Sequence, residues 1–249
     1  MWYYFLKDVG LLMKWHTLML SFVFFIQGCF SGGASDAVET VETSKPVKEE
    51  SALTEQLFQA VTEKDTDAVV NIIQKGVDID AQDAKGQTPL LIATRNNDVA
   101  TAEVLIDAGA DVNIQDNIKD SPFLYAGAEG YLEILKLTID AGADPKITNR
   151  YGGTALIPAS EHGYVEVVKE LLTRTEIDVN HVNNLGWTAL MEAVILNDGG
   201  EKQQQTIQIL IDHGADVNIA DRDGVTPLQH ARNKGFKEIE QILLKAGGK

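Results

Sequence analysis

The amino-acid sequence predicts an all-α solenoid of about six helix-turn-helix repeats, joined by β-turn fingers. Repetition is the first observation behind this prediction, because a motif of the Thr-Pro-Leu type recurs at intervals of about 33 residues. Its five copies begin at Thr88, Ser121, Thr154, Thr188 and Thr226. A second motif, Gly-Ala-Asp, begins at Gly109, Gly142 and Gly214. A row of equal structural units accounts for both motifs.

Each element of one unit follows from local chemistry. Thr88 is a suitable N-cap, and Pro89 fits the first position of a helix, where no backbone N–H is needed. A second helix is predicted where apolar residues recur at helical spacing, at Val167, Val168, Leu171 and Leu172. Gly109 suits the left-handed position that ends a helix. No unit can bury its apolar stripe alone, so neighbouring units must stack into one continuous core.

These motifs resemble the ankyrin repeat, whose core reads Thr-Pro-Leu-His-x-Ala. The resemblance covers residues 51–249 and divides them into the units 51–82, 83–115, 116–148, 149–182, 183–220 and 221–249. Polar residues in the first and last units predict solvated end faces, which keep a solenoid from stacking end to end.

The sequence departs from the ankyrin pattern in three ways. The histidine that follows Thr-Pro-Leu in the family is replaced, so packing must substitute for the Thr–His hydrogen bonds. The replacements are Leu91, Leu124, Ile157, Met191 and Gln229. Pro158 lies within a first helix, where it removes a backbone bond and should bend or shorten the helix. Extra residues around 197–202 are expected to form an exposed loop.

Residues 1–28 are predicted to be a signal peptide. Lys7 and Lys14 precede an apolar run over residues 18–26, which is shorter than the roughly 20 residues that span a bilayer. A basic segment followed by a short apolar run is typical of a secretory signal. Either Met1 or Met13 is a suitable initiator.

Cys29 is the only cysteine and follows this signal. Residues 26–29, Ile-Gln-Gly-Cys, resemble the lipobox of bacterial lipoproteins, although Gln27 replaces the small residue usual there. The resemblance implies a lipidated Cys29 and an extracytoplasmic protein, in the periplasm or on the outer face of the cell envelope. An ordinary signal followed by an incidental cysteine is the alternative. Residues 29–50 lack apolar periodicity and are expected to form a flexible tether.

Composition narrows the classes of partner. The chain of 249 residues is 44% hydrophobic and 23% charged, as expected of a soluble globular protein, and its formal net charge is -16. So acidic a surface repels phosphate, which argues against nucleic acid as a partner and leaves a cationic partner open.

The sequence does not predict an enzyme. Neither a nucleophile motif nor a phosphate-binding loop is present, and none of the five histidines pairs with another at metal-ligand spacing, so no cofactor, metal or small-molecule substrate is expected. Glu161 and His162 are adjacent at the expected solvent-side end of a first helix, and a hydrolase-type site there is the enzymatic alternative. Residues 221–224 are interpreted as a turn of the last unit.

In the ankyrin family the turn tips and the exposed flank of the first helices form a concave surface that grips other proteins. Mapped onto this chain, that surface carries candidate partner-binding residues at Ile118, Tyr151, His162, Leu185, Trp187, Ile195 and Leu196. Trp187 has two interpretations, an interface hot spot or a ring that stiffens the neighbouring turn. The extra loop could fold back over Ile195 and Leu196.

The resulting hypothesis is an exported, membrane-tethered module that binds an extracytoplasmic protein. Exported bacterial ankyrin proteins are thought to act beside enzymes, as accessory factors or as inhibitors, and the sequence does not choose between these roles. A structural scaffold of the envelope without a specific client is a further alternative.

Overall fold

The computed structural model describes residues 44–249, and residues 43–249 form a single compact unit. Twelve helices lie within the described residues, with no strand among them, so the all-α solenoid is confirmed. The signal peptide, residues 29–43 of the tether and Cys29 lie outside these residues and stay predictions. No helix from residue 44 onward is both long and apolar enough to cross a membrane.

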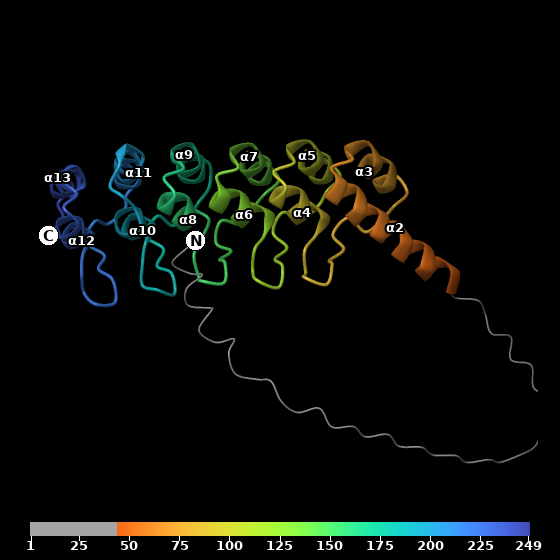
Figure 1. Ribbon diagram of the computed structural model, residues 1–249, viewed down its shortest axis with the longest axis horizontal. Helices are drawn as coiled ribbons and strands as arrows, with labels where there is room; N and C mark the ends of the chain where they lie inside the picture. Colours follow the sequence, from red (N-terminus) through yellow and green to blue (C-terminus); the bar gives the residue numbers. More distant parts are fainter. Residues whose placement is uncertain (1–43) are drawn as a thin grey trace, which may run out of the picture. The chain divides into compact units, whose positions relative to one another are not determined.

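The helices form six antiparallel pairs arranged in two rows (Figure 1). The first helices of the units are α2 (Ser44–Glu63), α4 (Pro89–Arg95), α6 (Pro122–Glu129), α8 (Leu156–Glu161), α10 (Ala189–Ile195) and α12 (Pro227–Lys234). The second helices are α3 (Thr66–Ile73), α5 (Val99–Asp107), α7 (Leu132–Asp140), α9 (Val165–Arg174), α11 (Glu201–Asp212) and α13 (Lys237–Lys245). Figure 1 shows the connecting loops extending as fingers on the side of the first-helix row.

The predicted N-caps are present in four of the first helices. The Thr88 hydroxyl accepts from the Leu91 N–H at 3.1 Å, and the hydroxyls of Ser121, Thr188 and Thr226 act in the same way at α6, α10 and α12. Proline follows the cap in α4, α6 and α12. Each cap satisfies a backbone donor that the helix itself leaves without a partner.

Pro158 shortens α8, as predicted, to six residues. In α4 the fourth residue after the cap donates to the cap carbonyl, as Ile92 N does to Thr88 O at 3.0 Å. Pro158 has no N–H to make the equivalent bond, and Ile157 N donates to Thr154 O at 3.2 Å in its place. The tighter turn therefore replaces the bond that proline removes.

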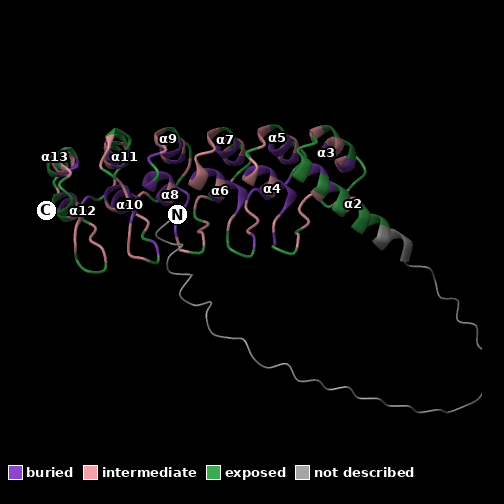
Figure 2. Cartoon of the chain, viewed as in Figure 1, coloured by how far each residue is buried: buried purple, intermediate pink, exposed green. Residues whose placement is uncertain are grey.

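The core lies between the two rows, where Figure 2 shows the buried residues. Four of the residues that replace the family histidine belong to the buried set, which confirms that packing substitutes for hydrogen bonding there. These are Leu91, Leu124, Ile157 and Met191, with at most 3% of the surface exposed. Gln229 is exposed instead, and its side chain accepts from Thr226 N at 3.0 Å in a capping box.

Two boundaries differ from the sequence prediction. Helix α2 begins at Ser44, so residues 44–50 are helical where the end of the tether was expected. Propagating a helix costs little once its later turns are packed, and Glu and Lys are good helix formers. The extra residues of unit five are also not a simple exposed loop, because α11 begins at Glu201 and Gln203 is buried. Asn197 turns the loop inward and accepts from Gln203 Nε2 at 2.9 Å.

Candidate partner-binding surface

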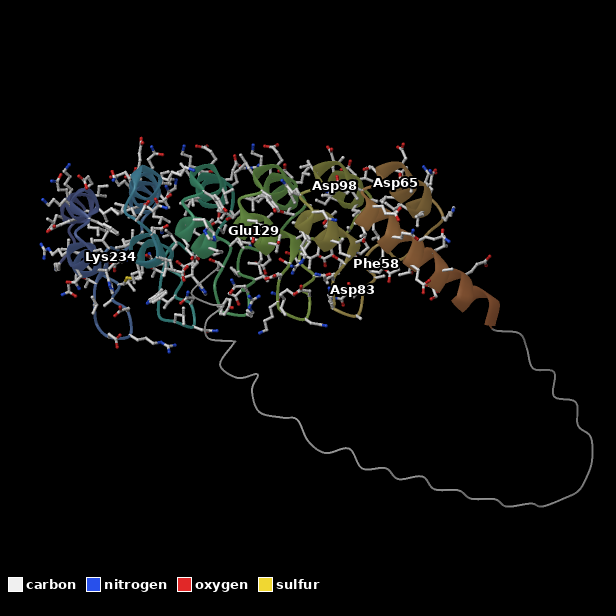
Figure 3. The ribbon with its side chains drawn as sticks, viewed as in Figure 1. Phe58, Asp65, Asp83, Asp98, Glu129 and Lys234 are labelled. Carbon is white, nitrogen blue, oxygen red and sulfur yellow. The ribbon has the colours of Figure 1, made fainter. Side chains whose placement is uncertain are left out.

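Each finger is held by one carboxylate or carboxamide at the start of its turn. The side-chain oxygen accepts two backbone N–H groups, two and four residues further along the chain. For Asn183 these are Leu185 N at 2.9 Å and Trp187 N at 3.1 Å. The equivalent residues are Asp83, which Figure 3 labels, and Asp116, Asn149 and Asp221. The prediction that residues 221–224 form a turn is therefore confirmed.

Neighbouring fingers lie against each other. Asn184 N donates to Tyr151 O at 2.9 Å, and the His181 ring contacts Gly152 O at 2.7 Å. Gly152 has a φ of +71°, and a Cβ there would lie 2.6 Å from the Asn184 side chain. Glycine is therefore required both by the left-handed backbone and by the close approach. The backbone of the fingers is therefore held in place by contacts within the free protein.

The structure places four of the predicted residues on three successive fingers. Ile118 is 47% exposed, while Tyr151, Leu185 and Trp187 are half-buried. The Arg150 guanidinium lies 4.6 Å from the centre of the Tyr151 ring. These residues form the finger ridge, which we define as Ile118, Tyr151, Leu185 and Trp187.

The other three predicted residues lie away from the finger turns. Ile195 and Leu196 are half-buried where α10 ends, next to the inward-turned loop, so neither is fully covered. His162 is exposed at the end of α8, and its ring lies 5.3 Å from that of Tyr164. Glu161 is only 9% exposed, so the expectation that both residues face solvent is wrong for Glu161.

Ion pairs that join helices to fingers were not foreseen from the sequence. Arg95 Nη2 binds Asp116 Oδ2 at 2.9 Å and Asp120 Oδ2 at 3.0 Å, linking α4 to the finger of the next unit. Burial raises the pKa of Asp120, although the charge of Arg95 lowers it. The residue types are ordinary partners for an ion pair. The pairing could not be predicted because Arg95 is 21 and 25 residues from the two aspartates in the sequence.

Two fingers are also tied to the helix that follows them. Asn183 Nδ2 donates to Glu192 Oε1 at 2.8 Å, and His230 Nε2 contacts Asp221 Oδ2 at 2.7 Å. Burial alone would raise the pKa of Asp221, but the hydrogen bonds from His230 and from the turn N–H groups outweigh it and the pKa is lowered. Both partners stand nine residues after the turn residue, a spacing that a search of the sequence could have found.

A cluster of tyrosines is the main feature that the sequence analysis missed. The Tyr125 and Tyr131 rings lie 6.3 Å apart, and the Arg95 guanidinium lies 4.6 Å from the Tyr125 ring centre. Tyr164, from the next unit, lies against Gly130, where a Cβ would be 2.9 Å from the ring. The described residues contain no group of His, Cys, Asp or Glu able to hold a metal ion.

Comparison with known proteins agrees with this architecture. The family model "Ankyrin repeats (3 copies)" matches residues 57–149 and 123–221. An ankyrin repeat protein of Escherichia coli strain K12, YahD, is 56% identical over 79 residues, which are 32% of this chain and 39% of that protein. The chain therefore matches less than half the length of this relative.

Solved structures extend the likeness to most of the described residues. An ankyrin repeat domain from Acinetobacter baumannii AYE is 55% identical with a TM-score of 0.76, over 78% of this chain and 98% of that one. The ankyrin repeat domain of Bcl-3, a member of the IkappaB family, is 27% identical with a TM-score of 0.69, over 78% and 86% of the two chains. From the repeated motifs, the paired helices and these matches together, the chain belongs to the ankyrin repeat family.

Proposed function

We propose that this protein is an exported, lipid-anchored module that binds another extracytoplasmic protein through its finger ridge. Ankyrin repeats generally bind other proteins and typically form a non-enzymatic scaffold. The observation that carries the proposal is Trp187, a half-buried aromatic residue on a finger whose turn is fixed by two hydrogen bonds from backbone N–H groups to Asn183.

The fixed turns favour binding for an energetic reason. A loop that is disordered when free must lose conformational entropy at the moment of association, at about 0.5–1.5 kcal/mol for each immobilised side chain. The finger turns already accept their hydrogen bonds in the free protein. Large aromatic residues on such a support are typical interface hot spots.

The sequence supports the cellular setting of the proposal. Residues 1–28 resemble a secretory signal and Cys29 follows in a lipobox-like motif. A lipid anchor with a tether would hold the repeats near a membrane and raise their effective concentration towards a membrane-associated client. The client is either an enzyme that the module assists or one that it inhibits.

Crosslinking mass spectrometry on the anchored protein in its native envelope identifies the client, and single variants then test the ridge. Trp187→Ala is expected to weaken client binding by roughly 30-fold, as about 2 kcal/mol of hot-spot energy implies. Leu244→Ala is the control, since Leu244 is an apolar residue, 45% exposed, on α13 and not on a finger. The melting temperature should change little in both variants. A large fall in melting temperature for Trp187→Ala with binding intact would contradict the proposal.

Anchoring is tested separately with Cys29→Ser, which removes the only sulfur that a lipid could modify. The variant should leave the membrane fraction and appear in the soluble extract. Equal amounts of the variant and the parent protein in washed membranes would show that Cys29 is not the anchor.

A further inference from the structure

A three-residue pattern recurs where a first helix ends and the second begins. It consists of a polar residue, a glycine and an aromatic residue, and it occurs as Glu129-Gly130-Tyr131, His162-Gly163-Tyr164 and Lys234-Gly235-Phe236. In all three the glycine has a positive φ, between 65° and 76°, and the aromatic residue is the N-cap of the following helix. The glycine conformation is therefore similar at the three places, while the polar residue differs at each and the aromatic residue is tyrosine twice and phenylalanine once.

In the last unit the pattern contains its own cation. Lys234 Nζ lies 5.5 Å from the centre of the Phe236 ring, which is within the range of a cation–π contact. In the third unit Glu129 occupies the position of Lys234, and Tyr131 that of Phe236. Figure 3 labels both Glu129 and Lys234. The third unit thus keeps the aromatic ring and carries a carboxylate where the last unit has an ammonium group.

Two further tyrosines complete the surroundings of Glu129. Tyr125 lies one helical turn before Glu129 on α6, and its ring is 6.3 Å from that of Tyr131. Tyr164 reaches across from the fourth unit to lie against Gly130, the residue next to Glu129. Tyr125, Glu129, Tyr131 and Tyr164 are all half-buried, so part of each remains accessible to solvent. We call these four residues the tyrosine cluster.

The charges near the tyrosine cluster favour an incoming cation. Burial raises the pKa of Tyr125 and of Tyr164, and in both the negative charge of Glu129 is the next largest cause. Glu161 contributes a further negative charge near Tyr164. The Arg95 guanidinium, which lies over the Tyr125 ring, is itself paired with Asp116 and Asp120. Among the ion pairs of residues 44–249, none joins Glu129 to a cation of the chain itself.

We propose that the tyrosine cluster binds a lysine side chain of the protein partner, supplying in trans the contact that Lys234 makes within the last unit. The ammonium group is held by the Glu129 carboxylate and the ring of Tyr131, the counterpart of Phe236, an arrangement of the kind that recognises cations. The inference rests on the proposed function, since it names the chemistry of the partner that the same module binds. It identifies a lysine-bearing segment as the contact, in agreement with the acidity of the whole chain.

A tetralysine peptide with a fluorescent label, titrated into the purified full-length chain at low ionic strength, tests the proposal by anisotropy. Saturable binding is expected, and Glu129→Gln should weaken it about fivefold or more by removing one close charge without changing side-chain size. Glu103→Gln is the matched control, because Glu103 is an exposed carboxylate on α5, in the second-helix row. It removes the same net charge and should leave binding nearly unchanged.

Glu129→Lys is a second variant, which restores the sequence pattern of the last unit. The introduced ammonium group should occupy the Tyr131 ring as Lys234 occupies Phe236, and peptide binding should fall below that of Glu129→Gln. Equal weakening by Glu129→Gln and Glu103→Gln would overturn the proposal, since binding would then follow net charge alone. So would the absence of saturable binding by the parent chain. The client-binding measurement on Trp187→Ala tests the role of the finger ridge separately, so failure of the lysine proposal and failure of the proposed function can be told apart.

Discussion

The junction between the third and fourth units is built differently from the junctions on either side of it. Between the second and third units Asn113 Oδ1 accepts from Asp144 N at 2.8 Å, and between the fourth and fifth Asn180 Oδ1 accepts from Asp216 N at 2.8 Å. Lys146 occupies the equivalent position between the third and fourth units. A lysine ammonium group has no lone pair to accept such a bond.

Close packing holds this junction, together with an ion pair between Arg174 of α9 and Asp140 of α7. A Cβ on Gly127 of α6 would lie 2.9 Å from the Cβ of Ala155, which immediately precedes α8, so the two units approach at a contact that only small residues allow. The Tyr164 ring lies equally close to Gly130 across the same junction. The comparison shows that a junction of the same solenoid can lack the loop hydrogen bond and be held by close packing and an ion pair. It also places the tyrosine cluster across the junction that lacks the loop bond.

The largest effect is expected from a cavity beside this junction. Leu156 in the fourth unit and Leu90 in the second are each at most 1% exposed, and truncating either to alanine should cost about 2–5 kcal/mol of unfolding free energy. Leu156→Ala should also separate urea unfolding into two transitions, because the array is expected to divide where the loop bond is missing. Leu90→Ala should keep a single transition. Identical transition shapes in circular dichroism would show that the junctions are equally cooperative.

A smaller effect is expected from filling the close contact. Gly127→Val should destabilise the protein by about 1–3 kcal/mol, because the new side chain must displace Ala155 and the start of α8. Ala128→Val is the control, since Ala128 is a half-buried neighbour on the same helix. Differential scanning calorimetry compares the two variants. If both melted at the parent temperature, the contact between α6 and α8 would not limit the stability of the junction.

The smallest effect is expected from exchanging the residues that distinguish the junctions. Asn113→Lys should lose about 1 kcal/mol by removing the acceptor for Asp144 N, whereas Lys146→Asn should gain up to about 1 kcal/mol by supplying the missing one. Both substitutions lie in the loops and not in the core. The shift of the urea unfolding midpoint therefore measures the change in stability of each variant without a contribution from repacking of the core. Loss of stability in both variants would mean that Lys146 has a favourable role that an amide cannot take.

The repetition in the sequence was sufficient to predict the fold. Thr88 and its counterparts mark the helix starts because capping is a local interaction, readable within four residues. The start of α2 was missed because residues 44–50 have no apolar periodicity, although helix formation continues from the packed turns that follow. The role of Asn197 was missed because a polar Asn-Asp-Gly-Gly stretch resembles a loop whichever way its side chains point.

The candidate surface was predicted only in part, for a physical reason. Residues on the fingers, such as Ile118 and Trp187, follow from position in the repeat, because each finger has the same backbone. The tyrosine cluster depends on contacts between units, where Tyr164 meets a residue more than thirty positions earlier. Within one unit, a tyrosine next to a glycine indicates nothing more than a helix boundary.

The hydrogen bonds that shape each finger are donated by main-chain N–H groups, so the turn itself does not depend on which side chains stand at the tips. Each loop is specified by one Asp or Asn at the start of its turn and by one residue of positive φ, which is glycine in four fingers and Lys119 in the finger of the third unit. A library randomised at residues 118, 151, 185 and 187 would therefore alter what the molecule recognises while leaving its scaffold intact. The fingers could therefore serve as a scaffold on which new binding specificities are selected.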